Sequence, residues 1–233
     1  MRTALFGGSF DPPHLGHIGI ALAAAARLRL DRVLMAPAGR QPLKRDQPQS
    51  SYKDRLAMVE LACRHHPPLI ASDIDAPRAD GRYNYTFDTL TQLRAASPGD
   101  DLFCLVGADS LVTLRQWHRA AEALLLAQWI VAARPGFPLE DLASLLPEGI
   151  HAGRPERRPD SSPDLSPDLV RVPLAAGTQQ GTLWLLPGLD YEISATALRA
   201  TFADASQRVL DPAVAAYARE HRLYPYTGGR SIR

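Results

Sequence analysis

Short apolar runs alternate with amphipathic segments along most of this chain. The apolar runs predict β-strands at residues 3–6, 32–36, 69–74, 102–106 and 129–133. The segments between them carry apolar side chains at helical spacing, and they predict helices at residues 15–30, after Ser51, at 86–96 and at 110–127. The runs at 102–106 and 129–133 are apolar at almost every position, which is typical of strands buried on both faces of a sheet.

This order of elements predicts an α/β fold. We expect a Rossmann-like doubly wound parallel sheet with right-handed crossovers, completed by a C-terminal helical segment. Ligands of such sheets bind outside the carboxyl ends of the strands, near the point where the strand order reverses. The loops after Phe6, Ala36, Val106 and Ala133 are therefore the places to look for chemistry. Residues 1–233 fit one large α/β domain of this kind, or two small ones.

The segment 153–168 differs from the rest of the chain. It contains four prolines among arginine, aspartate and serine, with a single apolar side chain, Leu165. Such a segment buries too little apolar surface to offset its loss of conformational entropy. We expect a mobile loop inserted into the domain, and a lid or docking segment is the alternative.

Composition excludes several classes of protein. Apolar residues make up 45% of the 233 residues, charged residues 22%, and the net charge is only +1. A surface that binds nucleic acid or an anionic membrane is not expected from this balance. Cys63 and Cys104 lack the spacing of a metal site or a disulfide framework. No signal peptide or membrane span is evident, so we expect a cytoplasmic protein, and the sequence does not define its oligomeric state.

The strongest chemical signal is residues 7–17, with the sequence GGSFDPPHLGH, between a predicted strand and a predicted helix. Glycines let the backbone approach an anion closely, and a helix N-terminus offers unpaired N–H groups. His14 and His17 lie three residues apart, so we expect them on one face of the first helical turn. Two imidazoles placed there could donate hydrogen bonds to a phosphoryl group that gains charge during reaction.

A second cluster lies at residues 193–199, with the sequence ISATALR. Ser194 or Thr196 could cap a helix and bind a phosphate oxygen, and Arg199 follows within about one turn as a bidentate clamp. Neither a G-x-G-x-x-G fingerprint nor a G-x-x-x-x-G-K-[ST] loop is present. Their absence disfavours a dehydrogenase and a P-loop NTPase.

Together these two motifs resemble those of the HxGH nucleotidyltransferase superfamily. Further segments resemble the bacterial nicotinate-mononucleotide adenylyltransferases in particular: residues 85–90 (YTFDTL), 107–111 (GADSL) with Trp117, 133–138 (ARPGFP) and 221–224 (HRLY). The resemblance covers residues 1–139 and 190–224. It implies transfer of AMP from ATP to nicotinate mononucleotide, giving nicotinate adenine dinucleotide and pyrophosphate in NAD biosynthesis.

The resemblance also implies roles for individual residues. The catalytic group would be His14, His17, Lys44 and Arg199. ATP would be bound by Gly7, Gly8, Ser9, Phe10, Gly107, Asp109, Ser194 and Thr196. The pyridine mononucleotide would be bound by Tyr85, Thr86, Trp117 and Arg134. Mg²⁺ would be held mainly by ATP, and no residue is expected as a metal ligand.

Thr86 suggests how the acid form of the mononucleotide could be preferred over the amide. We expect Thr86 to be the N-cap of the helix at 86–96, so that its hydroxyl and the following N–H groups form an anion site.

The reaction needs no covalent intermediate, because positioning and charge neutralisation carry most of the rate acceleration.

Three alternatives remain open. The chain could be another member of the superfamily, such as a phosphopantetheine adenylyltransferase, although such enzymes are typically shorter and the segments at Thr86, Trp117 and Arg134 fit them poorly. It could be a nucleotide sensor without activity, against which the intact His14 and His17 argue. An NAD-dependent oxidoreductase is disfavoured by the missing fingerprint.

Overall fold

We describe a computed structural model of the 233-residue chain. The structure describes residues 1–44, 50–132, 142–157, 168–186, 198–199, 202 and 208–224. Most of the loop predicted at 153–168 lies outside these ranges, so its mobility and the division of the chain into domains stay predictions. Within them no helix is long and apolar enough to cross a membrane.

The strands follow the apolar runs of the sequence. They are β1 (Arg2–Gly8), β2 (Arg32–Pro37), β3 (Leu69–Ala71), β4 (Asp101–Gly107), β5 (Gln128–Ala132), β6 (His151–Ala152), β7 (Glu156–Arg157), β8 (Val170–Ala176) and β9 (Gln179–Leu186). The first five strands confirm the predicted runs, although β3 is shorter than residues 69–74. The last four strands were not predicted, and β7 forms within the segment predicted to be a loop.

Helices occupy most of the segments between the parallel strands. They are α1 (Leu15–Arg27), α2 (Tyr52–Cys63), α3 (Thr86–Ala96), α4 (Ala108–Val112), α5 (Ala120–Leu126), α6 (Leu142–Leu145) and α9 (Pro212–Glu220), with 3-10 turns η1 (Pro42–Lys44) and η2 (Leu114–Gln116). The helix predicted at 110–127 is wrong as a single element. The chain breaks there because Trp117 is extended and Arg119 adopts a left-handed backbone with φ of 51°.

The described strands form one sheet in the order β3-β2-β1-β4-β5-β9-β8-β6, with β7 beside β8. Every pair from β3 to β9 in this order is parallel, whereas β8 runs antiparallel to β9. The sheet reverses its strand order between β1 and β4, the predicted ligand position. The doubly wound parallel sheet is thus confirmed, and an antiparallel hairpin extends one of its edges.

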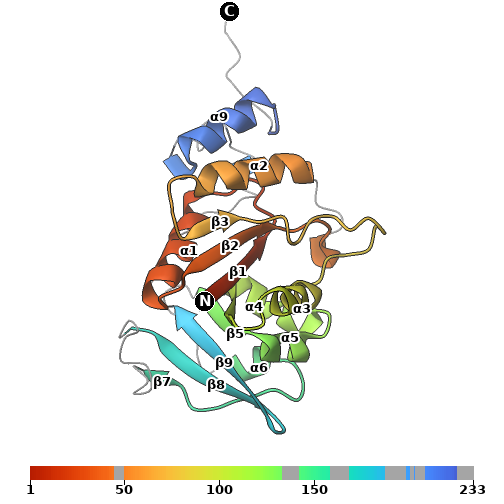
Figure 1. Ribbon diagram of the computed structural model, residues 1–233, viewed down its shortest axis with the longest axis vertical. Helices are drawn as coiled ribbons and strands as arrows, with labels where there is room; N and C mark the ends of the chain where they lie inside the picture. The colour runs from red at the N-terminus through yellow and green to blue at the C-terminus, as the bar shows by residue number, and fades with distance from the viewer. Residues whose placement is uncertain are drawn as a thin grey trace, which may run out of the picture.

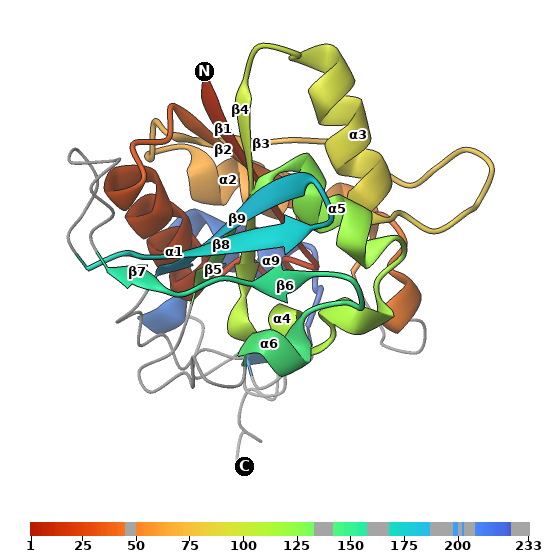
Figure 2. The ribbon, with the colours of Figure 1, turned by 90° about the horizontal axis from the view of Figure 1, so that it is seen from below.

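Two apolar clusters lie on opposite faces of the sheet because successive strand residues point to opposite sides. In β1, Ala4 and Phe6 join the cluster shared with α1, α2 and α9, and Leu5 joins the cluster under α3, α4 and α5. In β4, Phe103 and Leu105 alternate with Leu102 and Cys104 in the same way. Figures 1 and 2 show the sheet between these two groups of helices.

Side-chain caps fix the starts of α2 and α9, and a hydrogen bond joins these two helices. Ser51 caps α2 by accepting a hydrogen bond from the Asp54 backbone N–H at 3.1 Å, while its hydroxyl donates to the Asp54 carboxylate at 2.6 Å. Asp211 caps α9 by accepting from the Ala213 N–H at 2.7 Å. The Tyr217 hydroxyl on α9 then donates to Asp54 at 3.0 Å. These contacts hold α9 against α2, and α9 leads the chain to Tyr224.

Candidate active site

A cleft of about 670 Å³ opens at the carboxyl ends of β1 and β4. Its described lining includes the predicted site residues Gly7, Gly8, Tyr85, Thr86, Asp109 and Trp117. It also includes Gln41, Pro42, Leu43, Asp75, Asn84, Thr89, Thr113, Gln116 and His118, none of which was assigned from sequence. Loops from both halves of the sheet thus meet at the switch point, as the fold requires.

The glycine loop forms one end of this cleft. At Gly7 a Cβ atom would meet nothing within 4 Å, whereas at Gly8 it would lie 3.1 Å from the Phe10 ring. Phe10 is only 1% exposed, and its ring packs edge-on against Phe6 at 5.5 Å. The Phe10 side chain is therefore part of the core beneath the loop, and only its backbone is placed to meet a nucleotide.

The two motif histidines stack on each other beside this loop. His14 is the N-cap of α1 rather than a residue of its first turn, but the rings still stack at 3.6 Å. The Nδ1 atom of His14 accepts the His17 backbone N–H at 3.3 Å, and the Nδ1 atom of His17 accepts the His14 backbone N–H at 3.2 Å. Because each Nδ1 accepts, a neutral ring carries its proton on Nε2. Burial lowers the pKa of His14 to about 4, so its imidazole is neutral at physiological pH.

Arg199 reaches the same loop from the far end of the chain. Its Nη1 atom donates a hydrogen bond to the Asp11 backbone carbonyl at 2.9 Å, across 188 residues of sequence. The structure thus brings the second predicted cluster to the first. His14, His17 and Arg199 adjoin the glycine loop but do not line the cleft itself.

The buried carboxylate of Asp11 joins three parts of the chain, and sequence reasoning gave it no role. It is 1% exposed and accepts hydrogen bonds from the Tyr224 hydroxyl at 2.7 Å and the Ser50 backbone N–H at 3.1 Å.

Arg55, 2% exposed, donates to the Ser9 carbonyl at 2.9 Å. Burial lowers the pKa of Arg55, and the Asp11 charge opposes that shift. A signal for Arg55 exists: it lies on the buried stripe of α2, with Met58, Val59 and Ala62.

Aromatic side chains form the other end of the cleft. Trp117 is half-buried, packs on Trp129 at 5.8 Å between ring centroids, and donates from Nε1 to the Thr113 hydroxyl at 3.2 Å. One side of its indole thus belongs to the core while the residue lines the cleft. Thr86 lines the cleft as predicted, but Tyr85 is the N-cap of α3, with no side-chain capping hydrogen bond. The prediction that Thr86 caps this helix is wrong.

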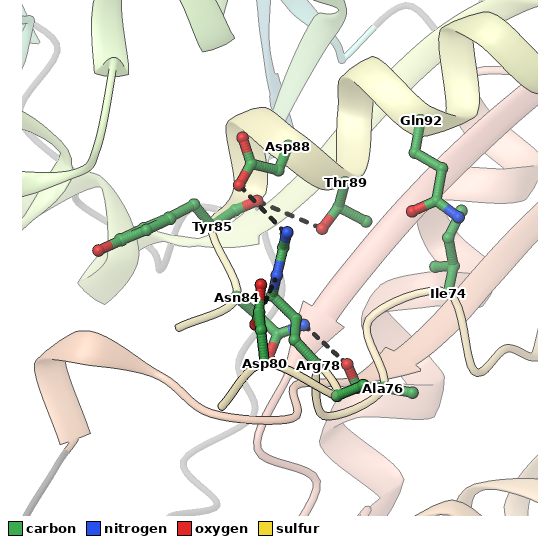
Figure 3. A pocket seen from close by; sticks show the side chains of 10 residues that line it. Ile74, Ala76, Arg78, Asp80, Asn84, Tyr85, Asp88, Thr89 and Gln92 are labelled. Atoms are coloured by element: carbon green, nitrogen blue, oxygen red, sulfur yellow. Dashed lines mark hydrogen bonds and ion pairs between the residues drawn. The ribbon is translucent and has the colours of Figure 1, made fainter. Parts of the chain in front are cut away.

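Asn84 joins the two loops that border this end. Its backbone N–H donates to the Arg40 carbonyl at 2.9 Å, and its side-chain oxygen accepts the Arg40 N–H at 3.0 Å. Its Nδ2 donates to the carbonyls of Asp75 and Ala76 at 3.2 and 2.9 Å. A Cβ atom at Gly39 would come within 2.5 Å of the Pro77 nitrogen, so the close approach of these loops requires glycine. Figure 3 shows Asn84 in a neighbouring pocket of about 420 Å³ that shares Tyr85 and Thr89 with the cleft.

Asp75 places a carboxylate in the lining of the cleft. It accepts a hydrogen bond from the Thr89 hydroxyl at 2.8 Å. Burial raises its pKa to about 6, against opposing effects of the Thr89 and Asn84 hydrogen bonds and the Arg55 charge. Asp75 therefore titrates close to physiological pH.

The remaining predicted residues are placed only in part. The Ser9 hydroxyl donates to the Gln41 side-chain oxygen at 3.2 Å, and Gly107 is the N-cap of α4, which carries Asp109 into the cleft. The backbone of Lys44 ends η1 beside the cleft. Arg134, Ser194, Thr196 and the Lys44 side chain lie outside the described residues. Among the described residues, no group of three or more histidine, cysteine or carboxylate side chains could hold a metal ion.

Comparison with known proteins gives a consistent result. A family model described as cytidylyltransferase-like matches residues 5–201. The "Probable nicotinate-nucleotide adenylyltransferase" of Solibacter usitatus is 33% identical over 96% of this chain and 100% of its own length. The protein of the same name from Chromobacterium violaceum is 39% identical over 96% of this chain and 98% of its own length.

Solved structures agree at the level of the fold. Plasmodium falciparum nicotinic acid mononucleotide adenylyltransferase, complexed with NaAD, superimposes with a TM-score of 0.68 at 13% identity, covering 96% of this chain and 97% of that one. The same Plasmodium enzyme complexed with APC gives a TM-score of 0.65. At this identity the likeness concerns the arrangement of the strands and helices.

Proposed function

Since the chain belongs to the cytidylyltransferase-like family, and within it to the nicotinate-nucleotide adenylyltransferases, we propose that its cleft transfers AMP from ATP to nicotinate mononucleotide. The products are nicotinate adenine dinucleotide and pyrophosphate. The observation that carries this proposal is the meeting of the stacked His14–His17 pair and Arg199 at one glycine loop. That loop ends β1, where the strand order of the sheet reverses.

The reaction proposed for the glycine-loop end of the cleft is an in-line displacement. A phosphate oxygen of the mononucleotide forms a bond to the α-phosphorus of ATP, the bond to the bridging oxygen breaks, and pyrophosphate leaves with the electron pair. The Nε2–H groups of His14 and His17 are the donors we assign to the phosphate oxygens, because both Nδ1 atoms are already occupied. Arg199 would then neutralise charge on the leaving group. Lys44, Ser194 and Thr196 remain proposed partners of the phosphates.

At the other end, the pyridine ring would stack on Trp117, whose orientation is fixed by its hydrogen bond to Thr113. The nicotinate carboxylate would lie near Thr86, where α3 begins without a side-chain cap. Carboxylates accept stronger hydrogen bonds from N–H groups than amide oxygens do. An amide would also direct its own N–H groups at these donors. Arg134 remains the proposed partner of the mononucleotide phosphate.

We propose that Mg²⁺ enters bound to ATP, because Mg²⁺ keeps several waters and is usually held by substrate phosphates. When bound, it would offset part of the triphosphate charge. The side chains of His14, His17 and Arg199 act on the phosphate oxygens that remain.

A coupled assay of pyrophosphate release tests this function. ATP is supplied with nicotinate mononucleotide, nicotinamide mononucleotide or pantetheine phosphate in turn. We expect turnover with both pyridine mononucleotides and roughly 10²-fold higher kcat/KM for the acid, because the amide leaves donors unpaired. Turnover with pantetheine phosphate alone would indicate a different enzyme of the superfamily. ATP binding without turnover on any acceptor would indicate a nucleotide sensor.

A further inference from the structure

The charges that line the cleft are unfavourable for an acidic substrate. Among the described lining residues, Asp75 and Asp109 carry carboxylates, and His118 is the one side chain able to carry a positive charge. A nicotinate carboxylate entering this space needs a hydrogen-bond donor of its own. The position of His118 therefore bears directly on which mononucleotide is accepted.

His118 lies where α5 approaches the start of α3. Its ring stacks on Tyr85 at 4.4 Å between centroids, with 35° between the planes, and meets the Phe87 ring edge-on at 6.4 Å. Both contacts flank Thr86 in sequence. Two aromatic side chains thus hold the imidazole beside the first turn of α3, next to Trp117.

The neighbouring charged groups are already paired with each other. Arg119 stacks over the Phe87 ring at 3.7 Å and donates from Nε to Glu122 at 2.6 Å. That hydrogen bond is the main reason why the pKa of Glu122 is lowered, with a smaller electrostatic contribution from His118. Arg119 is also not part of the cleft lining. The described ranges provide no hydrogen-bond partner for either ring nitrogen of His118, so these atoms remain available to a ligand.

From these observations we infer that the His118 imidazole donates a hydrogen bond to the nicotinate carboxylate and sets the preference for the acid over the amide. The inference rests on the proposed function, since it names a specificity-determining side chain for the same site. Histidine is a donor in both its neutral and its charged state, and a carboxylate partner favours the charged state. An amide oxygen gains less from the same donor, so discrimination follows.

The decisive variant is His118→Phe, which keeps an aromatic ring against Tyr85 and removes both nitrogens. We expect kcat/KM for nicotinate mononucleotide to fall at least about tenfold, in line with loss of a charge-assisted hydrogen bond. The value for nicotinamide mononucleotide should change less than about threefold, and KM for ATP should stay constant. His65→Phe, an exposed histidine beyond the end of α2, is the matched control and should leave all three values unchanged.

Equilibrium binding separates this inference from the proposed function. Titration calorimetry gives Kd for each mononucleotide with the wild type and with His118→Phe, whether or not turnover occurs. A lowered acid-to-amide affinity ratio in His118→Phe supports the inference. An unchanged ratio, or an equal loss for both ligands, overturns it and leaves His118 as a ring that only packs. Failure of the wild type to release pyrophosphate would overturn the proposed function alone.

Discussion

The two ends of the cleft are built in different ways. We name them after the substrate groups proposed for them: the phosphate end at the glycine loop, and the pyridine end at Trp117 and His118. At the phosphate end the structural groups are buried: His14 is 6% exposed, Asp11 1% and Arg55 2%. Each is fixed by the backbone or by a side chain distant in sequence. At the pyridine end Trp117 is half-buried and His118 is exposed, and both follow the short turn η2.

This difference in burial and hydrogen bonding suggests that the phosphate end serves the reaction and the pyridine end serves the choice of substrate. A group that must meet a transition state has to be held in place before the substrate arrives, because misplacement of about 1 Å is costly. The cross-braced phosphate end meets this need. In the proposed function, the pyridine end would contact a part of the substrate where no bond changes, so its residues could alter the choice of substrate at little cost to the reaction. Mutations at the two ends should therefore have separable effects.

The largest effect is expected for His17→Ala. Removal of one donor to the reacting phosphate should lower kcat by about 10²–10³ with both mononucleotides alike. Because the His17 ring also closes the cap of α1, unfolding free energy should fall by about 1 kcal/mol. Steady-state kinetics and urea unfolding measure the two. A kcat within a few-fold of wild type would remove His17 from the chemistry.

Acidification should change the free energy of unfolding in opposite directions through His14, at the phosphate end, and Asp75, at the pyridine end. Burial lowers the pKa of His14 from its ordinary value of 6.5 to about 4, so its contribution to stability is present above pH 6.5 and is lost as the pH falls toward 4. The pKa of Asp75 is about 6 against 3.8, so its contribution is present below pH 3.8 and is lost as the pH rises through 6. Each amounts to about 3 kcal/mol.

Asp75→Asn removes one of these two opposing contributions to the pH dependence of unfolding. The variant lacks the gain that Asp75 provides on acidification, so between pH 7 and pH 4 it should lose about 2 kcal/mol more unfolding free energy than the wild type. Urea unfolding across this range measures the slope. Parallel slopes for the two proteins would contradict the raised pKa of Asp75.

Arg199→Lys tests the phosphate end from the other side of the chain. Lysine keeps the charge but loses the fork that can contact the Asp11 carbonyl and a phosphate together. We expect kcat/KM for ATP to fall roughly tenfold or more, with an unchanged acid-to-amide ratio. Arg208→Lys, on an exposed residue of the same C-terminal region, is the control and should behave as wild type. Equal kinetics in the two variants would return Arg199 to a structural role.

The smallest effect comes from a pair of tyrosines whose hydroxyls both bond to aspartate. Tyr224→Phe leaves the buried Asp11 without one of its donors and should lower unfolding free energy by about 1–3 kcal/mol. Tyr217→Phe removes a bond to Asp54 between α2 and α9, which faces water and should cost less than about 1 kcal/mol. Thermal or urea unfolding distinguishes them. A larger loss for Tyr217→Phe would contradict the bracing role of Asp11.

The sequence predicted the parallel half of the sheet well because its strands are nearly continuous apolar runs, and α3 falls on the residues expected, 86–96. The hairpin of β8 and β9 was missed, because Pro173 interrupts β8 and β9 begins with polar residues. The helix at 110–127 was overextended because Leu111, Leu114 and Leu124 keep a helical spacing across the break.

The candidate site shows the same division. The glycine loop and its histidines are contiguous in sequence, so the motif predicted them together. Asp11 lies inside that motif, but its partners Tyr224 and Ser50 are remote, and only the fold joins them. The pyridine end depends on loops that meet in three dimensions, such as Asn84 against Arg40. No local pattern marks such contacts.

The Asp11–Tyr224 hydrogen bond spans 213 positions of the chain, which has a consequence for biosynthesis. Arg199 also reaches the loop from late in the sequence. While the chain is being translated, the parallel strands and the glycine loop leave the ribosome long before either partner is made. A nascent or truncated chain that stops short of these residues has the nucleotide motif but lacks its braces. We therefore expect ATP binding to require synthesis through Arg199 and Tyr224, and fragments that stop short of them should not sequester the nucleotide.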